Sequence, residues 1–289
     1  MKWKIATFNV NGILSREHVV ISWLERSRPD VLCLQEIKCQ DSEFPVDSLR
    51  LAGYEASVCG QKSLHGVAIL SRARPEEVRR GFGDGGLDTE ARLIAAKIDG
   101  IWIFNTYVPQ GRSPEHPAFQ MKLDFFARLK NLFQREFRPS DPVIWTGDIN
   151  VAPEEMDVFS PRRMDGKIGF HPLERQALAQ VASWGFIDLF RKHHPNVRQF
   201  TFWDYRLPES FRRDLGWRLD HIRATEPVAC TSLDCRVDAD LRGQPNPSDH
   251  TPVWAEIETG SKLTRQNSPS EPLSLSAKAI QPHPEGCLF

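Results

Sequence analysis

The sequence predicts an α/β fold, because apolar segments of strand length alternate with longer segments of helical periodicity along most of the chain. No internal repeat at a solenoid period is present, and no Pro/Gly/Ser-rich linker interrupts residues 1–258. We therefore expect one domain over residues 1–258. Between Gly260 and Phe289 the chain holds four Pro and five Ser with little apolar periodicity, so residues 259–289 are expected to form a disordered C-terminal tail.

The first half of the chain supplies mainly strands. Residues 4–10 form a strand-like segment that ends in polar residues, and Ser15 is expected to cap a helix that Pro29 ends after Arg28. Residues 31–34 are continuously apolar and are followed at once by Gln35 and Glu36. Further strands are expected at residues 67–70, 93–98 and 101–108, the last two joined by a hairpin turn at Asp99-Gly100.

The second half of the chain contains the long helices. The segment 114–137 has apolar residues at helical spacing, namely Phe119, Leu123, Phe126, Leu129, Leu132 and Phe133. A strand is expected at residues 143–146, and a second helix begins at Pro172, a favoured first-turn residue, and passes Val181. Residues 200–202, 218–224 and 251–258 complete the predicted strands.

Composition and charge are typical of an intracellular globular enzyme. The formal net charge is −1, which excludes a global attraction to nucleic acid, so any DNA or RNA partner requires a local basic face. Arginines cluster at 72–80 and again at 212–218, and each cluster is most simply a solvated surface. The six cysteines show no zinc-ligand spacing, and no signal peptide or membrane-spanning stretch is visible, so we expect a cytoplasmic protein.

Polar residues follow apolar strands at six places, which is an unusual way to end a buried strand. If these strand ends converge, they bring together carboxylates, two amides, a phenol and an imidazole. The residues are Asn9, Glu36, Tyr107, Asp148, Asn150, Asp220, Asp249 and His250. Oxygen ligands without a thiolate suit a hard cation such as Mg²⁺, with Mn²⁺ as a substitute. No phosphate-binding P-loop and no GxSxG motif are present, so water attack on a phosphodiester is the simplest interpretation.

Motifs from about residue 4 to residue 257 resemble the exonuclease III family of apurinic/apyrimidinic (AP) endonucleases, within the endonuclease/exonuclease/phosphatase superfamily. GDIN at 147–150 and SDH at 248–250 are typical of the superfamily. The narrower family is indicated by LQEIK at 34–38, YVPQG at 107–111, FTFWDYR at 200–206 and GWRLDHI at 216–222. The resemblance implies a four-layered α/β sandwich, in which two mixed β-sheets pack face to face with helices outside.

The resemblance also implies a role for each strand-end residue. Glu36 would be the principal Mg²⁺ ligand, with Asn9 and Asp249 beside the metal. Asp148 would orient or deprotonate the attacking water, and Asn150 would position that water and the phosphate. His250 would contact the scissile phosphate and be oriented by Asp249. Tyr107 and Asp220 would complete the phosphate-binding and leaving-group side.

A substrate pocket is implied by three apolar residues, Phe202, Trp217 and Leu219. Taken alone they read as core residues of strands, but the matching family positions accept a flipped-out sugar that lacks a base. By the same resemblance, Gln110 and Arg112 are expected to contact DNA.

The resulting hypothesis is a Mg²⁺-dependent DNA repair nuclease that incises 5′ to abasic sites, with 3′→5′ exonuclease and 3′-phosphodiesterase or phosphatase activity. Its partner would be double-stranded DNA with abasic sites or damaged 3′ ends, bound by a monomer associated with the nucleoid of a prokaryote. Two alternatives stay open. One is a superfamily phosphatase for a lipid, inositol or nucleotide, and the other is a DNA-binding module without activity.

Overall fold

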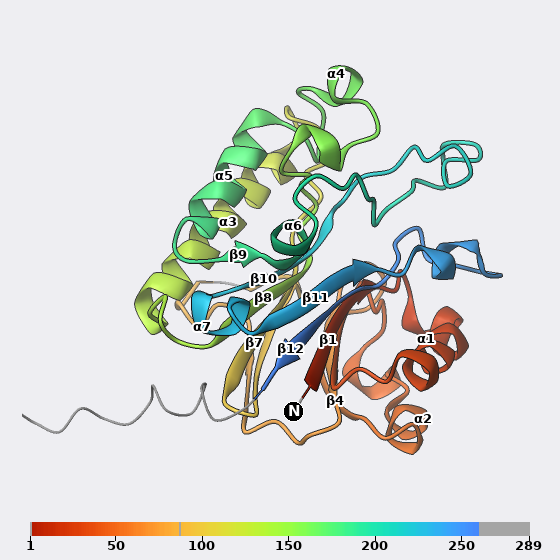
Figure 1. Ribbon diagram of the computed structural model, residues 1–289, viewed down its shortest axis with the longest axis vertical. Helices are drawn as coiled ribbons and strands as arrows, with labels where there is room; N and C mark the ends of the chain where they lie inside the picture. The colour runs from red at the N-terminus through yellow and green to blue at the C-terminus, as the bar shows by residue number, and fades with distance from the viewer. Residues whose placement is uncertain (1, 87, 260–289) are drawn as a thin grey trace, which may run out of the picture.

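The computed structural model describes residues 2–86 and 88–259, which form two mixed six-stranded β-sheets that pack face to face (Figure 1). Helices cover the outer face of each sheet, so the layers run helix, sheet, sheet, helix. The predicted four-layered α/β sandwich is confirmed. The expected disordered tail lies, except for Thr259, outside the described residues.

The first sheet has the strand order β11-β12-β1-β2-β4-β3. The β1–β2 pair is parallel, and every other neighbouring pair of this sheet is antiparallel. Its strands are β1 (Lys2–Asn9), β2 (Val31–Gln35), β3 (Glu55–Cys59), β4 (Val67–Ser71), β11 (Ser232–Val237) and β12 (Val253–Glu258).

The second sheet has the strand order β5-β6-β7-β8-β10-β9. Here β7 and β8 are parallel and the remaining neighbours are antiparallel. Its strands are β5 (Glu77–Arg80), β6 (Leu93–Ile98), β7 (Ile101–Tyr107), β8 (Val143–Asp148), β9 (Ile187–Asp188) and β10 (Asp220–Ala224).

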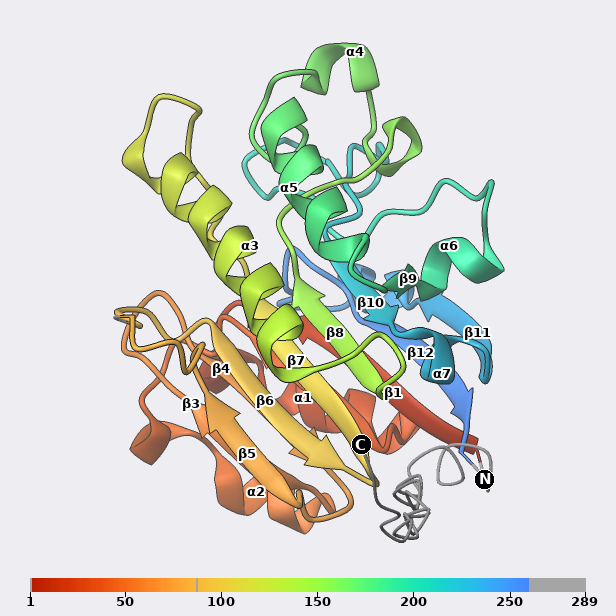
Figure 2. The same ribbon diagram turned by 90° about the vertical axis from the view of Figure 1, so that its left-hand side faces the viewer.

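Helices of very different length connect the strands. Figure 2 shows α3 and α5 lying across the outer face of the second sheet, while α1 and α2 cover the first sheet. The α-helices are α1 (Ile13–Ser27), α2 (Val46–Leu51), α3 (Pro117–Glu136), α4 (Pro161–Met164), α5 (Pro172–Ala182), α6 (Leu189–His193) and α7 (Glu226–Ala229). The 3₁₀ turns among the described residues are η1 (Asp41–Glu43), η2 (Glu155–Asp157) and η3 (Ala239–Gly243). Within the described ranges, no helix combines the length and the apolar character that crossing a membrane requires.

Strand alternation distributes the apolar residues between the layers. On β1, Ile5 faces the core between the two sheets, whereas Ala6 and Phe8 face the core under α1 and α2. On β8, Ile144 faces the core between the sheets and Trp145 packs under α3 and α5. Both faces of the central strands are therefore buried, which explains their nearly continuous apolar sequence.

Several predicted elements need correction. Residues 200–202 make only isolated bridges, through Phe202, rather than a strand. The first helix begins at Ile13, so Ser15 lies inside its first turn, where its hydroxyl bonds the carbonyl oxygen of Gly12. In α3, Lys122 is fully buried, whereas Leu123 is partly exposed. The arginines at 212–218 do not share a surface, because Arg218 is 1 % exposed.

Candidate active site

The polar residues at the strand ends continue the faces that line the core between the sheets. Asn9 follows Ile5 at even spacing on β1, Asp148 follows Ile144 on β8, and Asp220 precedes Ile222 on β10. The side chains therefore converge where the apolar layer ends. At this point lies a cavity of about 410 Å³, lined by Glu36, Tyr107, Gln110, Asp148, Asn150, Ile168, Gly169, Phe202, Asp204, Tyr205, Arg206, Trp217, Leu219, Asp249 and His250. Asn9 and Asp220 lie behind this lining and bond Asp148 and His250, respectively.

Below this cavity, a hydrogen-bonded polar layer joins the two sheets. The Gln35 amide donates to the Thr7 hydroxyl at 2.9 Å and to the Asn105 side-chain oxygen at 2.7 Å. The Asn105 amide donates in turn to the backbone oxygens of Leu34 and Ala68, each at 2.9 Å. This layer separates the apolar core from the charged cavity and fixes the relative position of the two sheets at the site.

The Asn9 amide links two carboxylates that come from different sheets. Its Nδ2 lies 2.9 Å from Glu36 Oε1 and 2.9 Å from Asp148 Oδ2, while its Oδ1 accepts the N–H of Asn11. Asn9 thus contributes to the site as a donor in this arrangement, and its role as a metal ligand stays a prediction.

Glu36 is held as an ionised carboxylate. Burial raises the pKa of its carboxyl, but the Lys38 ammonium and the Asn9 amide outweigh burial and lower the pKa overall. Lys38 Nζ lies 2.9 Å from Glu36 Oε2. Glu36 also adopts a left-handed backbone conformation, with φ of 50°, a strain that is typical of functional positions.

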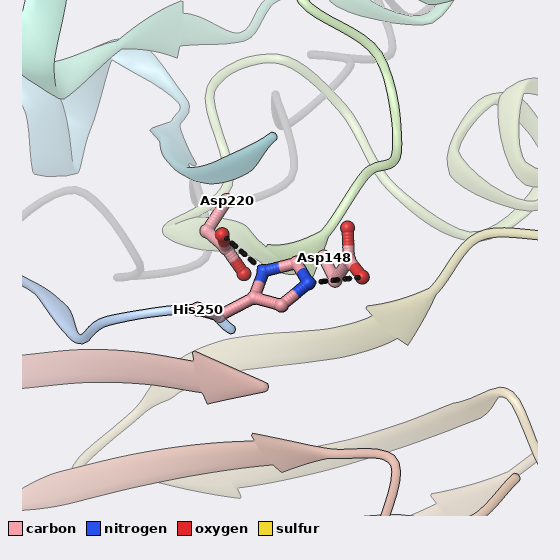
Figure 3. Close-up of side chains that lie close together, drawn as sticks. All are labelled: Asp148, Asp220 and His250. Carbon is pink, nitrogen blue, oxygen red and sulfur yellow. Dashed lines mark hydrogen bonds and ion pairs between the residues drawn. The ribbon is translucent and has the colours of Figure 1, made fainter. Parts of the chain in front are cut away.

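His250 lies between two aspartates, and Figure 3 shows its two ring nitrogens facing them. Nδ1 is 2.8 Å from Asp220 Oδ2, and Nε2 is 3.8 Å from Asp148 Oδ2. Burial lowers the pKa of His250, but the carboxylates of Asp220 and Asp148 outweigh burial and raise it to about 10. His250 is therefore an imidazolium at neutral pH.

The prediction that Asp249 orients His250 is wrong, because Asp220 holds the imidazole. Adjacent residues of an extended segment point in opposite directions, so the side chains of Asp249 and His250 diverge. Asp249 Oδ1 accepts the Asn11 amide at 2.9 Å. Asn11 in turn accepts a hydrogen bond from Lys38, so Asp249 joins the Glu36 side of the cavity.

Asp148 is the carboxylate at the centre of the site. Its Oδ1 accepts the backbone N–H of Asn150 at 2.9 Å, and its Oδ2 accepts the Asn150 amide at 3.2 Å. Burial raises the pKa of Asp148 to about 7, with Asp220 and Glu36 adding to the effect and His250 opposing it. Such a pKa suits a base that works near neutral pH.

Tyr107 enters the cavity as a neutral phenol. Burial raises its pKa well above the usual value, and the Glu36 and Asp148 carboxylates raise it further. The Arg92 guanidinium stacks on the ring at 4.6 Å from the centroid. Tyr107 can therefore donate a hydrogen bond without carrying negative charge.

The three predicted pocket residues lie together, and one of them, Phe202, contacts the imidazole of His250. Phe202 and Trp217 stack with ring centroids 5.4 Å apart and planes 9° apart, and Phe202 lies 4.8 Å from His250. Leu219 forms part of the same apolar cluster and the same cavity. Gln110 lines the cavity, whereas Arg112 is exposed and does not.

The donor set fits a hard divalent cation. Glu36 and Asp249 supply carboxylate oxygens on one side, and a cation, Lys38, already pairs with Glu36. Asp148, Asp220 and His250 also have atoms within 4.8 Å of one another, but an imidazolium cannot donate a lone pair. Glu36 is therefore the better anchor for an oxygen-ligated metal.

Sequence reasoning gave no role to Lys38 or Lys122, although both contact the site. Lys38 was visible only as part of the LQEIK motif. A signal for Lys122 did exist, since it lies three residues after Phe119 and four before Phe126, in phase with the apolar stripe.

Comparisons with known proteins agree with this geometry. Residues 6–250 match the endonuclease/exonuclease/phosphatase family. The chain is similar to exodeoxyribonuclease III of Haemophilus influenzae, with 35% identity over 266 residues that cover 88% of this chain and 99% of the relative. An AP endonuclease structure from Archaeoglobus fulgidus shares 44% identity at a TM-score of 0.87, covering 89% of this chain and 100% of that one. The 3′ phosphatase NExo from Neisseria, bound to a product DNA hairpin, shares 34% identity at a TM-score of 0.85, with the same coverage.

Proposed function

The chain belongs to the endonuclease/exonuclease/phosphatase family, and we propose that it is a Mg²⁺-dependent DNA repair nuclease of the exonuclease III type. One observation carries the proposal: a buried imidazolium and a carboxylate of near-neutral pKa face the same cavity as a stacked aromatic pocket. Phosphodiester hydrolysis needs an activated water and stabilisation of the phosphate charge, and these groups supply both.

Each side chain has a defined part in the reaction. Asp148 accepts the proton of the attacking water, and Asn150 holds Asp148 in place and orients the water beside it. His250 donates from Nε2 to a nonbridging phosphate oxygen while Asp220 holds its Nδ1. Tyr107 donates from its hydroxyl on the leaving-group side.

Glu36 and Asp249 would hold the cation, which would supply charge neutralisation at the phosphate. Asn9 fixes Glu36 against Asp148 through its two hydrogen bonds. Lys38, which pairs with Glu36 in the structure, keeps that carboxylate ionised and ready to bind.

The aromatic pocket selects a sugar that lacks a base. Phe202 and Trp217 stack on each other and leave an apolar surface beside His250, where a flipped sugar fits next to the scissile phosphate. Flipping is cheapest where no base is stacked or paired. Cleavage 5′ to the site would leave a 3′-hydroxyl and a 5′-deoxyribose phosphate.

The same cavity would also accept a damaged 3′ end, so 3′→5′ exonuclease and 3′-phosphodiesterase or phosphatase activities belong to the proposal. Relatives named as exodeoxyribonuclease III and 3′ phosphatase support this range. The substrate would be double-stranded DNA of the nucleoid, and the enzyme would act as a monomer.

One experiment tests abasic specificity. A duplex with a central abasic analogue and a matched intact duplex are offered in Mg²⁺ or in EDTA, and both ends of each product are mapped. We expect internal incision of the abasic duplex alone, only in Mg²⁺, and its loss in Asp148→Asn. Degradation of both duplexes from their 3′ ends without internal incision would refute abasic specificity and leave a plain exonuclease.

A second variant in the same assay tests whether the aromatic pocket selects the substrate. Phe202→Ala removes half of the stacked pair, so the ratio of abasic to intact cleavage should fall. An unchanged ratio with normal total activity would show that other residues select the substrate.

A further inference from the structure

A lysine and a glutamate form a fully buried ion pair beside the loop that follows β8 and carries Asn150. Lys122 on α3 and Glu174 on α5 both have side chains 0% exposed, and Lys122 Nζ lies 2.6 Å from Glu174 Oε1. Helices α3 and α5 already pack through apolar residues such as Leu129 and Leu178. Burying two charges between them carries a desolvation cost that apolar side chains would avoid.

The remaining donors of Lys122 go to backbone oxygens of two site loops. Nζ donates to the Asn150 carbonyl at 2.7 Å and to the Gln110 carbonyl at 3.2 Å. With Glu174, these contacts use all three N–H bonds of the ammonium. Lys122 therefore ties the loop after β7 to the loop after β8.

Glu174 extends the connection to the wall of the substrate pocket. Its Oε2 accepts the backbone N–H of Gly169 at 2.8 Å and that of His171 at 3.0 Å. Gly169 lines the cavity, and its carbonyl oxygen accepts the N–H of Ala152 at 2.7 Å. The pair thus joins the pocket wall to the segment that follows Asn150.

The loop that Lys122 holds is under local backbone strain. Asn150 has φ of 55°, in the left-handed region, and its amide bonds Val108 O at 2.9 Å as well as Asp148. A residue in that conformation persists only when its surroundings determine it strongly. The Lys122 contact on the Asn150 carbonyl supplies such a restraint.

We propose that Lys122 and Glu174 are a positioning pair, which holds Asn150, and through it Asp148, in register with the wall of the substrate pocket. This inference rests on the proposed nuclease function. A misplacement of about 1 Å at a reacting group can lower a rate by about 100-fold, so the pair should act on turnover. A pair that merely joined α3 to α5 would act on stability alone.

The test compares three variants with the wild type on the abasic duplex: Lys122→Met, Glu174→Gln and the double variant Lys122→Met/Glu174→Met. Each single variant should lower kcat by about 10- to 100-fold while KM changes by less than about threefold. Both should also melt at a lower temperature, because one buried charge loses its partner. Lys130→Met, the same change two turns further along α3 at a partly exposed position, should leave kcat and KM unchanged.

The double variant separates positioning from stability. It leaves no unpaired charge, so its melting temperature should exceed that of either single variant. Its kcat should nevertheless stay low, because the Asn150 carbonyl and the Gly169 N–H still lack their partners. Recovery of kcat together with the melting temperature would overturn the proposal.

Amide hydrogen exchange tests the positioning role independently of any activity measurement. In Lys122→Met, the Gly169 and His171 amides should exchange at least about tenfold faster than in the wild type, because Glu174 loses the cation that holds it. Unchanged protection would overturn the positioning role. Failure of the wild type to incise the abasic duplex would instead refute the proposed function, so the two failures can be told apart.

Discussion

Replacing Asp220 by Asn tests whether the charge on His250 drives catalysis. Asp220 Oδ2 lies 2.8 Å from His250 Nδ1, and both side chains are buried, at 0% and 5% exposure. Asparagine preserves the size and an acceptor oxygen for Nδ1 but removes the negative charge. The substitution therefore changes the pKa of His250 with little change in the shape of the site.

The size of the effect follows from the charges around the imidazole. Burial lowers the pKa of His250, but Asp220, Asp148 and Asp249 together raise it to about 10. Two charges about 4 Å apart interact by about 4 kcal/mol at an effective dielectric constant of about 20, which equals about three pH units. Without Asp220, the pKa of His250 should fall to about 7.

The assay is kcat/KM for incision of a labelled abasic duplex, measured from about pH 6 to about pH 10. Because the imidazolium is the active form, activity should be lost as pH rises through the pKa of His250. The wild type should lose activity only near pH 10, as the raised pKa requires. Asp220→Asn should lose it near pH 7, so the ratio of variant to wild type should drop about 100-fold between pH 6 and pH 9.

A flat ratio of the two enzymes across that range would refute this account of His250. Asp234→Asn serves as the control, because Asp234 is a partly exposed residue of β11 that pairs with Arg236 outside the cavity. Its pH profile should match that of the wild type.

Three further predictions concern metal binding and stability. Glu36→Gln should weaken Mn²⁺ binding at least about tenfold in calorimetric titration, because it removes the ionised anchor; equal affinity would place the metal elsewhere. Gly147→Ala should lower the free energy of unfolding by at least about 2 kcal/mol in thermal melts. Gly147 has φ of 133°, and a Cβ at this position would lie 2.0 Å from the backbone carbonyl oxygen of Thr106. Arg218→Met should lower the free energy of unfolding in urea by about 3–5 kcal/mol, because it removes the guanidinium that pairs with Asp157 at 2.7 Å and with Asp188 at 2.8 Å. The buried Asp157 carboxylate then keeps Arg191 as its partner, and a loss below about 1 kcal/mol would contradict a structural role for Arg218.

The sequence alone predicts the site well where one strand determines it. Val143–Asp148 is apolar until its last residues, and a buried strand that ends in Gly147 and Asp148 points to a rigid polar site. The helix Pro172–Ala182 begins at its predicted residue for the same local reason, a proline at the first turn. Such signals need only neighbours along the chain.

Contacts between distant segments could not be predicted in the same way. The His250 imidazole pairs with Asp220, which lies on a strand thirty residues earlier in the chain. Nothing in the local sequence shows that His250 pairs with Asp220 rather than with Asp249, its neighbour along the chain. The hydrophobic pattern of α3 predicts Leu123 in the core because it ranks leucine above lysine, although the helical phase favours Lys122. In both cases a charge pairing across elements overrides the local preference.

Burial and an excess of negative charge in the cavity account for the raised pKa of Asp148, and the same excess of charge accounts for the need for a cation. Apart from the mutually paired Asp204 and Arg206, the site holds two cations, Lys38 and His250, and four carboxylates, those of Glu36, Asp148, Asp220 and Asp249. With every carboxyl ionised, the cavity would carry two excess negative charges, which would repel a phosphate. Retaining a proton on Asp148 relieves one of these charges, as its pKa of about 7 reflects, but it also disables the base. A divalent cation would relieve both charges and would leave Asp148 free to accept the proton of water. Oxygen ligands, a raised aspartate pKa and an imidazolium therefore fit together in a site that cleaves a phosphodiester.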